Sequence, residues 1–160
     1  SASKREVYVD GLSSVLDRVA SRCGRFIHIS STSVYGQQEG EWVDENSPAE
    51  SKTESGDICR AAEKLVLDRF ADDDIAARGT VLRLSGIYGP SRLLSRIDAL
   101  KNAQPLPGPE DGWLNLIHVD DAAQVVMTCA LCESPELVYL VSDDRPVLRG
   151  RVPLSCSTGA

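Results

Sequence analysis

Residues 26–36, FIHISSTSVYG, are the stretch that decides the fold class. An apolar, β-rich run ends in a cluster of Ser and Thr at 30–33, which indicates a buried strand followed by a polar turn. Two further apolar runs follow at 79–87 and 138–141, with helical patterns between the runs. Because these runs are continuously apolar rather than alternating, we predict an α/β fold with a parallel sheet covered by helices.

Three stretches carry apolar residues at the spacing of a helix. They are residues 9–20, residues 56–71 with Ser55 as the N-terminal cap, and a helix that opens at Asp120. The two carboxylates at the start of the third helix, Asp120 and Asp121, suit the positive end of a helix dipole. A shorter helix is expected after Ser91.

The composition argues against two classes of partner. The chain has 24 acidic and 17 basic side chains, which gives a formal net charge of −7. Nucleic-acid binding needs clustered Lys and Arg, and no apolar run approaches the ~20 residues that span a bilayer. We therefore expect neither a nucleic-acid partner nor a membrane partner.

The cysteines indicate a reducing compartment. Five of them, an odd number, are scattered without the spacing of a disulfide framework. Cys129 and Cys132 form a C-x-x-C inside an apolar helical run, where core packing is the favoured interpretation and a redox or metal pair the alternative. We expect a cytoplasmic protein with no metal site.

Three segments resemble the extended short-chain dehydrogenase/reductase superfamily, in its NAD-dependent epimerase/dehydratase branch. They are FIHISSTSVYG at 26–36, VLRLSGIYGP at 81–90 and LIHVDDAA at 116–123. The resemblance covers about residues 7–145 and implies a partial Rossmann-like domain, which is a doubly wound parallel sheet lacking the family's N-terminal strands. Such sheets bind ligands at the carboxyl ends of their strands.

The resemblance also implies a catalytic residue. Ser31 takes the place of the family's catalytic Ser or Thr, which orients a substrate hydroxyl or carbonyl. The family's Tyr-x-x-x-Lys pair, an acid/base phenol with a Lys that lowers its pKa, falls on Ser55 and Cys59. Both groups of that pair are therefore absent, and neither Lys52 nor Lys64 restores the cation by its register. This departure resembles the atypical members of the superfamily.

Further site residues follow from the same resemblance. The cofactor side is expected at Ser30, Leu84, Ser85 and Gly86, and the substrate side at Thr32, Tyr35, Tyr88 and His118. Two alternatives remain: His118 is also interpretable as a hydrogen-bonded structural histidine, and Tyr35 and Tyr88 as half-buried aromatics.

The resemblance implies NAD or NADP as the cofactor. The family begins with a strand and G-x-x-G-x-x-G, whose glycines let a helix N-terminus approach the pyrophosphate. This motif is absent from the sequence. We therefore expect impaired cofactor binding, with residues 1–150 as the C-terminal portion of a family domain and 151–160 as an irregular tail.

The strand at 26–30 lacks the neighbour that the family fold would give it, so its edge is expected to be exposed and able to pair. We expect a homo-oligomer, or pairing with a missing N-terminal half, through this edge or through the helices at 9–20 and 56–71.

Three functions remain open at this point. The first is a truncated, atypical relative of the nucleotide-sugar epimerases and dehydratases, impaired in hydride transfer, that takes a small-molecule substrate. The second is a non-catalytic module that holds a metabolite or a protein partner. The third is a different reaction that recruits Cys59 or His118, which would need a thiol of depressed pKa beside a base.

Overall fold

A computed structural model of the chain describes residues 2–71, 78–90, 92 and 110–151. The helix expected after Ser91 and the tail beyond Arg151 lie outside these residues. None of the helices in the described ranges is both long and apolar enough to cross a membrane.

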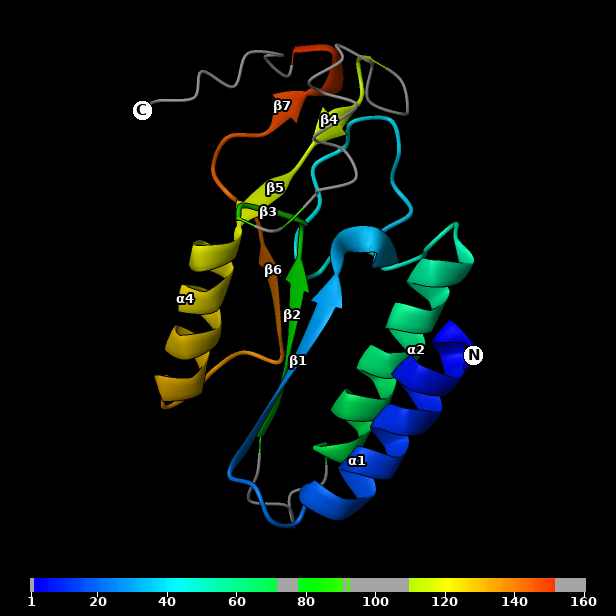
Figure 1. The fold of residues 1–160 in the computed structure, drawn as a ribbon, viewed down its shortest axis with the longest axis vertical. Coiled ribbons are helices and arrows are strands. Elements are labelled where there is room, and N and C mark those ends of the chain that lie inside the picture. The colour runs from blue at the N-terminus through cyan, green and yellow to red at the C-terminus, as the bar shows by residue number, and fades with distance from the viewer. Residues whose placement is uncertain (1, 72–77, 91, 93–109, 152–160) are drawn as a thin grey trace.

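A three-stranded sheet in the order β1-β2-β6 forms the centre of the fold (Figure 1). Both pairings are parallel, and β2, the central strand, is buried over nearly its whole length. A strand with apolar neighbours on both faces needs no polar alternation, which confirms the prediction drawn from the continuous runs. The strands are β1 (Arg25–Ser31), β2 (Arg78–Leu84) and β6 (Val138–Val141).

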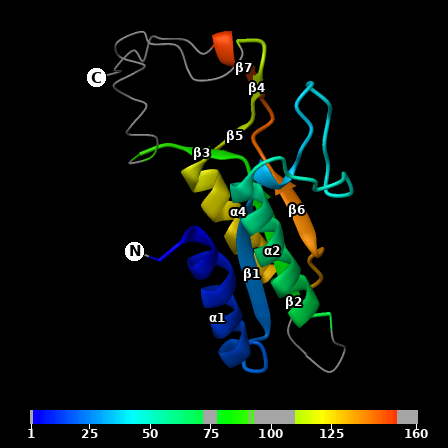
Figure 2. The same cartoon turned by 90° about the vertical axis from the view of Figure 1, so that its right-hand side faces the viewer.

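Helices cover both faces of the sheet, as a doubly wound arrangement requires (Figures 1 and 2). On one face, Leu16 and Val66 pack against Val81, and on the other Cys129 packs with Leu82. The helices of the first face are α1 (Leu12–Val19), preceded by a π-helical segment η1 (Glu6–Gly11), and α2 (Glu54–Arg69), and the helix of the second face is α4 (Val119–Leu131).

Two of the predicted helices begin earlier than the sequence suggested. The first is already helical at Lys4, because η1 continues into α1. The second is capped by Thr53 and not by Ser55, since Thr53 Oγ1 accepts a hydrogen bond from the Gly56 amide at 3.1 Å. The hydroxyl of Ser55 is thereby left for another role.

The strand predicted at 79–87 is interrupted at Ser85. The amide of Ser85 still donates to Val141 of β6 at 3.0 Å, whereas the next amide, Gly86, donates to Asn115 at 3.1 Å. The pairing partner changes there, so a separate strand β3 (Gly86–Tyr88) pairs in parallel with β5 (Leu116–His118). An antiparallel pair of β4 (Trp113–Leu114) with β7 (Val147–Leu148) was not predicted.

The cysteine motif on α4 belongs to the core. Cys129 is buried in the cluster around Leu82, while Cys132 caps the end of the helix, and both are free thiols. This favours the core-packing interpretation. Within the described ranges, no group of three His, Cys, Asp or Glu side chains could hold a metal ion.

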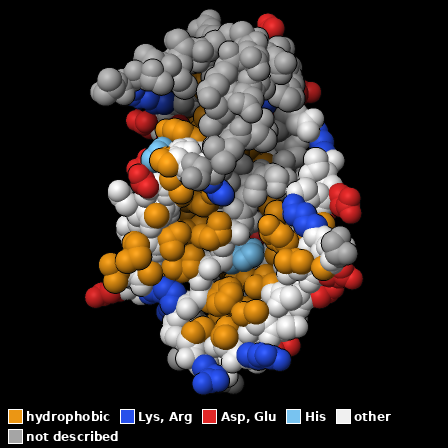
Figure 3. All heavy atoms as spheres, viewed as in Figure 1, with side chains coloured by type: hydrophobic (Ala, Val, Ile, Leu, Met, Phe, Trp, Pro, Cys, Tyr) orange, Lys and Arg blue, Asp and Glu red, His pale blue; other side chains and the backbone are white. Residues whose placement is uncertain are grey.

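One edge of β1 is unpaired among the described residues, because β1 pairs with β2 alone. This edge position of β1 agrees with the expectation, and the ability of the edge to pair stays a prediction. Hydrophobic side chains gather on the face of the molecule that carries β1 (Figure 3). The exposed large apolar residues of β1 and the N-terminal helix are Ile29 on β1 and Val7, Tyr8 and Val15 on the helix. Association through this surface stays a prediction.

Candidate functional site

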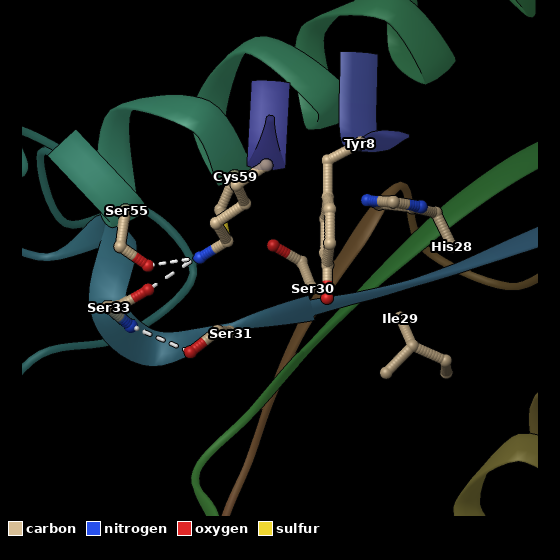
Figure 4. A pocket seen from close by; sticks show the side chains of 9 residues that line it. Tyr8, His28, Ile29, Ser30, Ser31, Ser33, Ser55 and Cys59 are labelled. Atoms are coloured by element: carbon tan, nitrogen blue, oxygen red, sulfur yellow. Dashed lines mark hydrogen bonds between the residues drawn. The ribbon is translucent and has the colours of Figure 1, made fainter. Parts of the chain in front are cut away.

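A pocket of about 240 Å³ opens at the carboxyl end of β1 (Figure 4). It lies between the Ser-rich turn, the first turns of α2 and the start of the N-terminal helix. Because a sheet brings the carboxyl ends of its parallel strands to one edge, this is the place where open α/β folds bind ligands. The lining residues are Lys4, Tyr8, His28, Ile29, Ser30, Ser31, Ser33, Ser55 and Cys59.

The turn after β1 is a single turn of 3-10 helix, η2 (Thr32–Val34), and Ser31 is its N-terminal cap. The Ser31 hydroxyl accepts a hydrogen bond from the Ser33 amide at 3.2 Å. Accepting this bond leaves the hydroxyl hydrogen of Ser31 free to donate to a ligand. Ser31, the expected catalytic residue, therefore lines a pocket with its hydroxyl hydrogen available to a ligand. Its neighbour Thr32 is not among the lining residues.

A buried network holds this turn in place. Ser30 Oγ donates to Glu63 Oε1 at 2.5 Å, and Arg83 donates to both carboxylate oxygens of Glu63. Glu63 is 4% exposed and Arg83 7% exposed, so the ion pair lies in the interior. It joins β1, α2 and β2 beneath the pocket. The hydroxyl of Ser30, expected on the cofactor side, is committed to Glu63.

Tyr35 belongs to the same network. Its hydroxyl accepts from Arg83 Nη1 at 2.9 Å and donates to the carbonyl of Asp44 at 2.8 Å. Burial raises the pKa of Tyr35, although Arg83 opposes this shift, so the phenol stays protonated near neutral pH. Tyr35 thus anchors the loop that follows the turn, and a role in substrate binding stays a prediction.

Ser55 and Cys59 both reach the pocket from α2. Ser55 Oγ accepts a hydrogen bond from Lys4 Nζ, and the Cys59 thiol lies 3.9 Å from Ser33 Oγ. Lys4 was missed by the sequence analysis, which looked for a replacement cation only at Lys52 and Lys64. The available signal was the spacing Lys4-x-x-x-Tyr8, which places both side chains on one helix face once the helix begins at Lys4.

Tyr88 and His118 form a second group at the ends of β3 and β5. Their rings meet edge to face with centroids 5.2 Å apart, and neither residue lines the pocket at β1. His118 Nδ1 accepts from the Asp120 amide at 3.3 Å and so caps α4. This cap supports the structural interpretation of His118, and a role of either residue in substrate binding stays a prediction.

The segment from Leu84 to Gly86 crosses the carboxyl end of β2. Leu84 packs in the core, and Ser85 Oγ is buried without a hydrogen-bond partner among the described residues. Ser85 is not among the residues that line the pocket at β1, so its place on a cofactor side stays a prediction. The sequence also offers no glycine-rich cradle for a pyrophosphate. The residues present therefore do not form a complete dinucleotide site, and no chemical step through the cofactor follows from them.

His28 makes the stability of the fold depend on pH. Burial lowers the pKa of His28 below its ordinary value of 6.5, and the nearby Glu63 only partly opposes this. The folded chain then binds the proton more weakly than the unfolded chain. The stability that neutral His28 contributes is therefore fully present above pH 6.5 and is lost as the pH falls below 6.5 through the lower pKa of the folded chain.

We therefore expect the unfolding free energy to fall as the pH is lowered from above 6.5 to below it, and His28→Gln to flatten this slope. Urea titrations of both proteins at several pH values measure it. The other ionisable side chains that line the pocket, Lys4, Tyr8 and Cys59, are retained in the variant. An unchanged slope in His28→Gln would contradict this assignment.

The fold and the pocket define a Rossmann-type α/β protein with a hydroxyl-rich site at the carboxyl edge of its sheet. Residues 6–138 match the sequence profile of the NAD-dependent epimerase/dehydratase family, and the chain belongs to that family. Its structural neighbours are epimerases and dehydratases of the same fold.

The relatives are longer than this chain. Protein YeeZ of Escherichia coli K12 is 37% identical over 120 residues, which are 72% of this chain and 39% of YeeZ. A solved protein from Methylobacillus flagellatus, named as a candidate NAD-dependent epimerase/dehydratase, is 33% identical with a TM-score of 0.69, over 91% of this chain and 52% of that one. The chain thus spans about half or less of the length of these relatives.

Two more distant structures show the fold alone. MoeE5, solved in complex with UDP-glucose and NAD, is 23% identical with a TM-score of 0.76, over 88% of this chain and 50% of MoeE5. The dTDP-glucose 4,6-dehydratase of Bacillus anthracis, solved with NAD, is 17% identical with a TM-score of 0.78, over 91% of this chain and 49% of the dehydratase.

Proposed function

We propose that this chain carries the substrate-holding side of an atypical epimerase/dehydratase site, and that hydride transfer is impaired in the chain by itself. The observation that carries the proposal is the pocket at the end of β1, which joins Ser31 to Ser55 and Cys59. From the family resemblance, a Tyr phenol would be expected at the position of Ser55 and a Lys ammonium at the position of Cys59.

Ser31 is the residue that would orient the substrate. Its hydroxyl accepts from the turn and keeps its own hydrogen, so it can donate to a substrate carbonyl or hydroxyl oxygen. Ser55 cannot take over acid/base work at neutral pH, because an alcohol is a far weaker acid than a phenol. The chain then binds and orients without the group that would move a proton.

The substrate class proposed is a nucleotide sugar. Support comes from MoeE5, which was solved with UDP-glucose and also with UDP-glucuronic acid. The pocket volume of about 240 Å³ lies below the about 300–1,000 Å³ typical of sites for drug-sized ligands, which suits the sugar part of such a molecule.

The location proposed for the protein is the cytoplasm. The described cysteines are free thiols, as a reducing compartment would keep them; they are Cys23, Cys59, Cys129 and Cys132.

A non-catalytic binding module on the same scaffold is the second candidate. The exchange of the acid/base pair for Ser55 and Cys59 favours it, since a module that only holds a metabolite needs no proton transfer. NAD or NADP remains the cofactor proposed from the family, with tight binding expected only when the pyrophosphate cradle is supplied from elsewhere.

Calorimetric titration of the chain tests the proposed function. We expect UDP-glucose to bind, and NAD, NADH, NADP and NADPH to show no saturable binding at millimolar concentration. Ser31→Ala should weaken UDP-glucose binding by about tenfold, the usual effect of losing one well-formed hydrogen bond. Ser14→Ala, on the exposed face of α1, is the matched control.

Two results would overturn the proposal. Micromolar binding of a dinucleotide by this chain would mean that the cofactor site is intact. Absence of UDP-glucose binding would remove the substrate-holding role and favour a module with another ligand.

A further inference from the structure

Lys4 and Tyr8 stand one helical turn apart at the start of the N-terminal helix, and both line the pocket at the end of β1. Lys4 Nζ lies 5.3 Å from the centroid of the Tyr8 ring, which is within the range of a cation–π contact. The same ammonium donates to Ser55 Oγ across the pocket. Figure 4 shows the Tyr8 side chain in the pocket, between Ser30 and His28.

The pocket offers several hydrogen-bond donors, and the Lys4 ammonium is a cation among its lining residues. An ammonium carries three N–H donors, and Ser55 accepts one of those of Lys4. Ser31 Oγ accepts from an amide, so its hydrogen is available, and the Ser33 hydroxyl faces only the weakly accepting Cys59 sulfur at 3.9 Å. No carboxylate is found among the described residues that line the pocket.

The nearby acidic residues do not neutralise Lys4. Glu63 lies beneath the turn, where Ser30 and Arg83 use its carboxylate oxygens. Glu54 and Asp57, in the first turn of α2, are exposed and are not lining residues. Lys4 is exposed, and its ammonium donates to Ser55 at the pocket and forms no ion pair with a carboxylate of the described residues. A ligand in the pocket that supplies acceptors and negative charge would match it.

We propose that Lys4, supported by the ring of Tyr8, is the anion-binding group of this pocket, and that the pocket takes a small hydroxylated ligand with one oxyanion, a carboxylate or a phosphate. The hydroxyls of Ser31, Ser33 and Ser55 bind its oxygens. This assignment rests on the proposed function, because it concerns the same pocket and names the chemistry of its ligand.

Calorimetry with three probes tests the proposal: glucose 1-phosphate, glucuronate and neutral glucose. We expect at least one of the two anions to bind about tenfold or more tightly than glucose, as a charge-assisted hydrogen bond predicts, and added salt to weaken that binding. The preference between the two anions decides between phosphate and carboxylate.

Variants locate the effect. Lys4→Met should remove the preference for the anion, whereas Lys4→Arg should keep most of it. Tyr8→Leu, which removes the ring beside the Lys4 ammonium, should weaken anion binding. Lys64→Met is the matched control, because Lys64 is an exposed cation of α2 that pairs with Asp68 outside the pocket.

Several results would overturn this assignment. Equal binding of glucose and both anions, or an unchanged preference in Lys4→Met, would exclude Lys4 as the anion-binding group while leaving the proposed substrate-holding role intact. Absence of binding of all three probes would also overturn it, and UDP-glucose titration then shows whether the proposed function fails with it.

Discussion

Replacement of Arg83 by Met is expected to lower the free energy of unfolding by about 3–5 kcal/mol. The guanidinium donates to both oxygens of the buried Glu63 and to the hydroxyl of Tyr35. Without Arg83, the carboxylate of Glu63 stays in the interior with Ser30 as its remaining partner in this network. An uncompensated buried charge costs far more than the pair contributes when both partners are present.

Chemical denaturation at neutral pH measures this loss. Lys64→Met is the matched control, because it breaks the ion pair between Lys64 and Asp68 at the surface. The side chain of Lys64 is 75% exposed and that of Asp68 is 61% exposed, and such exposed pairs contribute about 0–1 kcal/mol to stability. The double variant Glu63→Leu with Arg83→Met should recover part of the loss, since no charge is then left unpaired. If Arg83→Met costs no more than Lys64→Met, the network does not hold the turn.

Gly56→Ala is expected to destabilise the fold by about 3 kcal/mol, although Ala is ordinarily the better residue in a helix. A Cβ at this position would lie 2.2 Å from the carbonyl oxygen of Ser33 and 2.0 Å from Ser51 Oγ. The side chain of Ser51 can rotate, but the backbone of the turn at Ser33 cannot move without disturbing η2. The start of α2 must then shift away from the turn.

Thermal and chemical unfolding measure this effect, and Gly24→Ala is its matched control. A Cβ at Gly24 would meet nothing within 4 Å, so its effect should stay within about 0.5 kcal/mol. Because Gly56 sets the distance between the turn and Ser55, Gly56→Ala should also weaken ligand binding in the pocket. Equal stability of the two alanine variants would mean that this contact does not position the site.

The sheet and its helices could be predicted from the sequence because each strand and helix shows its own local pattern of apolar residues. Continuous apolar runs indicate buried parallel strands, and 3.6-residue spacing indicates the helices that cover them. The break at Ser85 was not predictable in this way. It arises because the Ser85 amide donates to the carbonyl of Val141 and the next amide, Gly86, donates to the carbonyl of Asn115. Both acceptors lie far from Ser85 in the sequence, so no local pattern indicates the break.

The site was predictable only in part. Ser31, Ser55 and Cys59 were named from the Ser-rich turn and the family register, and the structure brings all three to one pocket, while their roles stay predictions. Lys4 lies before the apolar pattern that revealed the first helix, so nothing local assigned it to the site. The buried pairing of Glu63 with Arg83 was also hidden, because it requires knowing that β1, α2 and β2 are neighbours.

Amide chemical-shift mapping of the chain titrated with UDP-glucose tests the central claim, that ligands bind at the carboxyl end of β1. The account predicts the largest changes at residues 31–33 and at Ser55 and Cys59, with changes at Tyr8 on the facing helix. Changes confined to the β4–β7 pair at Trp113 and Leu148, or no changes at all, would contradict it.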